Sequence, residues 1–108
     1  MSGARRKTTR RQSRLRFETL NLFIDEGIAK AGLTAHEALT WMVLYRDTRP
    51  DGFATTSVAE IARRAGIGRR TAVRALARLR RLKMLRVARR GGLNRGASSY
   101  AVFPVPME

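Results

Sequence analysis

The apolar residues between Ser13 and Ala31 recur at the three- and four-residue spacing of an α-helix. The repeating positions are Leu15, Phe17, Leu20, Phe23 or Ile24, Ile28 and Ala31. Gly32 follows the run as a helix stop. The pattern therefore predicts a first helix over residues 13–31.

A capping box marks the start of the next predicted helix. Thr34 is followed three residues later by Glu37, and an apolar run comes after them, so a helix is expected from here to about Arg46. Residues 48–52 are dense in turn formers, and residues 53–56 are β-prone. The sequence predicts a turn and a brief strand after this helix.

A second capping box, Ser57 with Glu60, opens a short helix that runs through Ala65 and ends at Gly66. Its predicted inward face consists of Val58, Ile61 and Ala62. After a tight turn, another helix is predicted to begin near Arg69 and continue to about Leu82. These two helices are therefore joined by only a few residues.

The helix predicted over 69–82 has one apolar side and several arginine-rich sides. The apolar side consists of Ala72, Ala75, Leu76, Leu79 and Leu82. Because Ala72 and Leu76 already occupy the buried side, Val73 is predicted to face outward. The outward set is then Arg69, Arg70, Val73, Arg74, Arg78 and Arg81.

Two β-prone runs, 85–90 and 99–103, flank a glycine-rich segment at 91–98. They predict a hairpin with a long basic tip. Pro104 and Pro106 end the ladder because proline has no amide hydrogen to donate. The predicted fold class is mainly α with a small β-sheet.

The domain organisation follows from composition. Residues 1–12 are rich in Arg, Thr and Ser and lack apolar periodicity, so they are expected to form a flexible basic arm. A chain of 108 residues has room for one ordinary domain. We predict that domain over 13–103, followed by a C-terminal tail at 104–108.

Charge indicates the kind of partner. The formal net charge is +15, with +7 in residues 1–16, −4 in 17–60 and +12 in 61–108. Thirteen bases lie between Arg63 and Arg95 with no acid among them, so we expect a polyanion to relieve their repulsion. The middle segment is interpreted as a scaffold between two basic segments.

Several functional classes are disfavoured by what the sequence lacks. With no cysteine and one histidine, His36, we expect no disulfide, metal site or cofactor, and we find no nucleophile-base pair for an enzyme. No apolar run approaches the roughly 18 residues of a membrane span, and the basic N-terminus lacks a signal-peptide core. We expect a soluble, cytoplasmic protein without a small-molecule ligand.

Residues 57–100 resemble the winged helix-turn-helix family, most closely the small domains of plasmid and phage replication or regulatory proteins. Ala62 stands at the family's helix crossing, Gly66 at its left-handed turn and Ile67 at its apolar plug. Ala72 and Ala75 match buried positions of the second helix. The resemblance implies a winged helix-turn-helix fold and binding to double-stranded DNA.

Two residues depart from the family pattern. Gly68 replaces the usual Ser or Thr cap, which leaves the next helix without a side-chain acceptor unless a phosphate supplies one. Lys83 replaces the usual glycine after that helix, where a left-handed conformation costs more.

The resemblance and the outward pattern together assign candidate DNA contacts. Arginine bonds bidentately to guanine, and valine contacts a thymine methyl group, which suits base reading. The predicted base-reading residues are Arg69, Arg70, Val73 and Arg74, and the predicted phosphate contacts are Arg63, Arg64, Gly68, Thr71 and Arg78. The predicted wing contacts are Arg89, Arg90, Asn94 and Arg95, and the basic-arm contacts are Arg5, Arg6, Lys7, Arg10 and Arg11. A merely solvated arginine face is the alternative.

Two other functional classes stay open. One is nonspecific architectural binding of nucleic acid, although aromatic residues make up only 6% of the chain, which disfavours single strands. The other is dimerisation through the apolar surplus of the first helix, most simply with a second copy. Its candidate contacts are Leu15, Phe17, Leu20, Phe23 and Ile24. Trp41, Met42 and Tyr45 are interpreted as core, with a dimer contact as the competing view.

Overall fold

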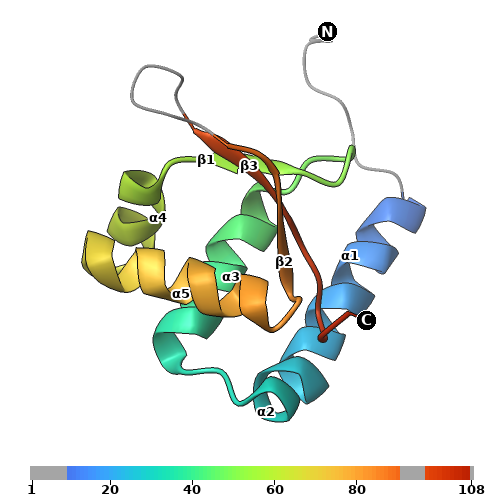
Figure 1. The fold of residues 1–108 in the computed structure, drawn as a ribbon. Helices are drawn as coiled ribbons and strands as arrows, with labels where there is room; N and C mark the ends of the chain where they lie inside the picture. Colours follow the sequence, from blue (N-terminus) through green and yellow to red (C-terminus); the bar gives the residue numbers. More distant parts are fainter. Residues whose placement is uncertain (1–9, 91–96, 108) are drawn as a thin grey trace, which may run out of the picture.

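The computed structural model describes residues 10–90 and 97–107. These residues form a mainly helical fold with a three-stranded antiparallel sheet, and α3 lies between α1 and α4 (Figure 1). The elements are α1 (Arg10–Leu22), η1 (Phe23–Gly27), α2 (Ile28–Ala31), α3 (Ala35–Asp47), β1 (Ala54–Thr56), α4 (Val58–Ala65), α5 (Arg69–Arg81), β2 (Leu85–Arg89) and β3 (Ser98–Val102). The coarse fold class predicted from the sequence is confirmed.

The first predicted helix is present as the succession α1, η1 and α2, and it ends as expected at Gly32, which has a φ of 65°. It begins at Arg10, three residues before the predicted Ser13, so Arg10 and Arg11 belong to this helix rather than to a flexible arm. Its turn at Phe23–Gly27 widens into a π-helix. Nothing in the hydrophobic spacing predicted this widening.

The core of the fold is centred on Trp41 of α3, which is fully buried. Its ring stacks on Phe23 at 3.7 Å and on Tyr45 at 5.0 Å between centroids. Phe23 is itself fully buried, so its prediction as a dimer contact is wrong. Apolar residues of the first helix occur on its buried side and on its exposed side. For this reason the spacing alone did not show that Phe23 is buried and Ile24 exposed. Of the three residues interpreted as core on α3, Met42 is exposed and Tyr45 half-buried.

Both predicted helix caps are present, although they differ in detail. Thr34 and Glu37 form the full capping box at the start of α3. The Ser57 hydroxyl accepts a hydrogen bond from the Glu60 amide at 3.1 Å, but the Glu60 carboxylate bonds to Arg63. The second box is therefore only half formed.

The sheet has the strand order β1-β3-β2, with Ala54 opposite Tyr100 and Leu85 opposite Val102. Lys83 leads the chain from α5 into β2 with a φ of 61°, the left-handed conformation expected there. The predicted hairpin strands are present as β2 and β3, with slightly different ends. The tip at 91–96 lies outside the described residues.

The C-terminal segment packs onto the helices. The Phe103 amide donates to the Met84 carbonyl at 2.9 Å, and the Met107 amide donates to the Lys83 carbonyl at 3.0 Å. The Pro104 carbonyl lies directly against Gly27 of η1. Residues 104–107, predicted to be a tail outside the domain, are thus part of its packing.

Gly27→Ala tests this last contact. A Cβ at position 27 would overlap the Pro104 carbonyl oxygen, so we expect the free energy of unfolding to fall by about 1 to 3 kcal/mol, although alanine favours a helix over glycine by about 1 kcal/mol. Urea unfolding followed by Trp41 fluorescence measures the change. The control is Asn21→Ala on exposed α1, for which a change within about 0.5 kcal/mol is expected. Equal stability of the two variants would contradict the packing described here.

Candidate nucleic-acid interface

The first half of α5 presents three exposed arginines around one exposed valine. Arg69, Arg70 and Arg74 are exposed, and Val73 is 52% exposed. The opposite side of the helix carries the buried residues Ala72, Ala75, Leu76 and Leu79. The outward position predicted for Val73 is confirmed, because the core is complete without it.

The start of α5 is open to solvent. Gly66, with a φ of 72°, ends α4, and Gly68 is the N-cap of α5. Gly68 offers no side-chain cap, and both Gly68 and Arg69 are exposed. Backbone amides at an uncapped helix start can bind an anionic oxygen. Thr71, in the first turn, is half-buried.

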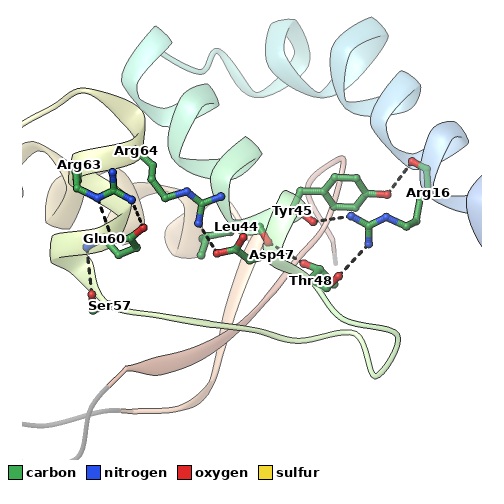
Figure 2. Close-up of polar contacts among 9 residues, drawn as sticks. All are labelled: Arg16, Leu44, Tyr45, Asp47, Thr48, Ser57, Glu60, Arg63 and Arg64. Carbon is green, nitrogen blue, oxygen red and sulfur yellow. Dashed lines mark hydrogen bonds and ion pairs between the residues drawn. The ribbon is translucent and has the colours of Figure 1, made fainter. Parts of the chain in front are cut away.

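Two arginines of α4 are held by carboxylates (Figure 2). Arg63 bonds to Glu60 through Nε at 3.1 Å, and Arg64 Nη1 lies 2.6 Å from Asp47 Oδ2. The hydrogen bond from Arg63 lowers the pKa of Glu60, and the same bond raises the pKa of Arg63. The bond to Asp47 likewise raises the pKa of Arg64. The Arg63 side chain remains 70% exposed, so its pair is a surface pair that a stronger anion can displace.

Arg78 has a different position from the one predicted. Its guanidinium lies 2.5 Å from Glu37 Oε1 and 3.2 Å from the Gly32 carbonyl oxygen. The Glu37 side chain is only 10% exposed and also accepts from the Thr34 amide. Arg78 thus links α5 to the start of α3, and its assignment as a phosphate contact is not supported. Although no acid lies among the bases from Arg63 to Arg95, acids earlier in the chain pair with three of them, so part of their repulsion is relieved within the fold.

A groove runs between α5 and the β2-β3 hairpin. Its lining includes Val58, Val73, Leu76, Ala77, Arg80, Leu85, Val87, Arg90, Ser98 and Tyr100. Arg80 was not among the predicted contacts, although it lies seven residues after Val73 and so projects from the same side of the helix. Arg80 and Arg90, both exposed, belong to the helix and hairpin sides of this groove.

The remaining predicted contacts divide between surface residues and positions not described. Arg89 and Arg90 are exposed at the end of β2, and Arg10 and Arg11 are exposed on α1. Arg5, Arg6, Lys7, Asn94 and Arg95 lie outside the described residues. Within 10–90 and 97–107, no three His, Asp or Glu side chains are grouped to hold a metal ion. No helix in these ranges is both long and apolar enough to cross a membrane.

Arg78→Ala separates the structural arginine from its neighbours. Losing the bond to nearly buried Glu37 should lower the free energy of unfolding by about 1 to 2 kcal/mol. Arg81→Ala, on the same helix and exposed, is the control and should change it by less than about 0.5 kcal/mol. Chemical denaturation of both variants tests this. Stability unchanged by Arg78→Ala would show that the ion pair contributes nothing to the α3-α5 contact.

No protein-family model matches the chain, and no curated protein or solved structure does so either. In the absence of a match, three local features of the described residues indicate where this chain could bind a partner. These are the free arginines at the start of α5, the open N-terminus of that helix and the groove beside the hairpin.

Proposed function

We propose that this chain is a winged helix-turn-helix protein that binds double-stranded DNA through the major groove. In this proposal α4 and α5 are the helix-turn-helix pair, and β2 and β3 carry the wing. One observation carries the proposal: Arg69, Arg70 and Arg74 are exposed with no ion pair in the described residues, whereas Arg63, Arg64 and Arg78 are bound to carboxylates. The N-terminal end of α5 therefore carries arginines without acidic partners. In helix-turn-helix proteins this end of the second helix enters the major groove of DNA.

The chemistry of this helix end suits base recognition. A guanidinium presents two parallel donors to guanine O6 and N7, and an exposed valine offers an apolar contact for a thymine methyl group. Arg70 and Arg74 are four residues apart and Val73 lies beside them, so the three side chains occupy neighbouring positions of one helix surface. We assign base reading to Arg69, Arg70, Val73 and Arg74.

Phosphate binding is assigned to groups around this surface. The open amides after Gly68 suit an anionic oxygen at the helix start. Arg80 and Arg90 flank the groove between α5 and the hairpin, where a DNA backbone would find a cation on each side. Arg63 can exchange Glu60 for a phosphate because their pair is exposed.

A nonspecific architectural role is the second candidate. It is favoured by the net charge of +15 and by exposed bases on elements far from α5 in sequence, such as Arg11 and Arg14 on α1 and Arg46 and Arg49 near the end of α3. Binding of this kind would rest on charge alone and would be equally strong for every duplex.

Selection of bound sites from a random duplex pool distinguishes the two candidates. For a sequence-specific protein, we expect an enriched motif whose affinity exceeds that of random duplex by about a thousandfold or more at physiological salt. Random duplex should show a steep loss of affinity with rising salt, since its binding consists of counterion release. Failure of any motif to enrich, with identical salt dependence for all duplexes, would establish the architectural role instead. A selected operator would also allow the roles of transcriptional regulator and of replication or recombination site-binding protein to be compared by locating it in the genome.

Arg74→Ala tests base reading directly. We expect discrimination at one base pair of the selected site to weaken by about 1 to 3 kcal/mol, measured by competition between duplexes that differ at that pair. Arg86→Ala is the matched control, because it removes the same charge from an exposed position of β2. The control should weaken binding to all duplexes alike and leave the preference intact. An unchanged preference in Arg74→Ala would remove Arg74 from the base-reading set.

A further inference from the structure

Large apolar side chains remain exposed along one side of the first helix and α3. Phe17 is 66% exposed, Ile24 51%, Leu39 40% and Met42 36%. Phe17 and Met42 line a shared hollow with Leu20 and Tyr45, bounded by Ser13, Arg16 and Arg46. Ile24 follows Phe17 by two helical turns, and Leu39 precedes Met42 by one. We call this set, with Leu20, the α1-α3 face.

Contacts on the inner side of the α1-α3 face hold the first helix against α3. The Arg16 guanidinium donates to the carbonyl oxygens of Tyr45 and Thr48 at 2.9 and 3.1 Å, and the Tyr45 hydroxyl donates to the Arg16 carbonyl oxygen at 2.7 Å (Figure 2). The guanidinium also lies 4.6 Å from the centre of the Tyr45 ring. Arg16, one of the seven bases of residues 1–16, thus joins α1 to α3.

Along this helix a group of bases is followed by a group of acids. Exposed Arg10, Arg11 and Arg14 lie in its first two turns, exposed Glu18, Asp25 and Glu26 follow them, and exposed Lys30 lies near its C-terminal end. Glu26 pairs with Lys30 at 3.7 Å. Within the described residues, Arg14, Glu18 and Asp25 have no ion-pair partner. The bases at positions 10–14 and the acids at positions 25 and 26 are complementary to those of an identical helix that runs in the opposite direction.

We propose that the α1-α3 face binds a second copy of this chain, with the two α1 helices antiparallel across a two-fold axis. An antiparallel pair that crosses near Leu20 sets Phe17 against Ile24 of the partner subunit. The same crossing brings Arg14 towards Asp25 of the partner subunit. The reason is that positions 14 and 25, like positions 17 and 24, lie almost equally far from Leu20 on either side. A two-fold interface forms each of these contacts twice.

The exposed apolar side chains of this face favour this occupant over a polyanion. Nucleic acid would be repelled by the carboxylates of Glu18 and Asp25 and would leave the apolar side chains unsatisfied. A parallel pairing would set the arginines of the first turns against each other, whereas the antiparallel one separates them to opposite ends. The helix α1 lies on the other side of α3 from α4 (Figure 1), so an α1–α1 contact leaves the arginines at the start of α5 accessible.

The first test is sedimentation velocity of the full chain, purified free of nucleic acid, over a range of micromolar concentrations. We expect the wild type to dimerise reversibly and Phe17→Asp to remain a monomer with an unchanged circular dichroism spectrum. Leu15→Asp is the matched control, because Leu15 is 49% exposed on α1 but lines a different hollow, and it should still dimerise. A monomeric wild type, or a dimer lost in Leu15→Asp and kept in Phe17→Asp, would overturn the proposal.

The second test uses charge reversal to establish the orientation. Arg14→Glu and Asp25→Arg alone should each weaken dimerisation by about tenfold or more, because each sets like charges together twice. The double variant restores opposite charges across the interface and should recover the wild-type dissociation constant. Single variants that dimerise as well as the wild type, or a double variant weaker than both, would overturn the antiparallel arrangement. Because all these positions are exposed, the variants are expected to fold normally.

Discussion

The stacking of Trp41 between Phe23 and Tyr45 is the interaction on which the rest of the structure depends. Trp41 is fully buried, lies 3.7 Å from the Phe23 ring, and donates from Nε1 to the Phe103 carbonyl oxygen at 2.9 Å. One side chain of α3 therefore holds the first helix on one side and the C-terminal segment on another. Since α5 also packs on α3, the position of its arginines is set relative to this same helix. The aromatic cluster thus helps to fix the position of the candidate interface through α3, although it is not part of that interface.

The fold sorts a large excess of arginine into structural and free groups. Carboxylates near the two ends of α3 each bind an arginine from later in the chain, since Glu37 holds Arg78 and Asp47 holds Arg64. The segment with a net charge of −4 is thus the electrostatic counterpart of part of the basic segment that follows it. Repulsion among the remaining cations is not relieved in this way at the start of α5. The net charge alone suggests an anionic partner, and the distribution of ion pairs is the reason why the proposed function assigns its contact to the start of α5.

The sequence predicted features that depend on neighbouring residues and missed those that depend on distant ones. The outward Val73 follows from local spacing, and the left-handed conformations at Gly66 and Lys83 follow from the resemblance to the helix-turn-helix pattern. The structure has all three. By contrast, Arg78 bonds to a carboxylate 41 residues away, and Trp41 bonds to a carbonyl 62 residues away. Helical periodicity predicts which residues lie on the same face of a helix. It does not predict which other element packs on that face. For this reason the sequence grouped Phe23 with the exposed apolar residues and Arg78 with the free arginines.

The two proposed interfaces are coupled through α3, and this coupling limits how they act together. The first helix is fixed to α3 by the Trp41 stack and by Arg16, while α5 is fixed to α3 by Arg78. The first helix and α5 thus each pack directly on α3. In a two-fold dimer the separation of the two α5 helices is then a property of the folded chain. A rigid separation of this kind selects inverted half-sites of one spacing, since a change of spacing by one base pair also rotates one half-site around the duplex. Specificity would thus come from the packing of α3 as well as from the arginines that contact bases.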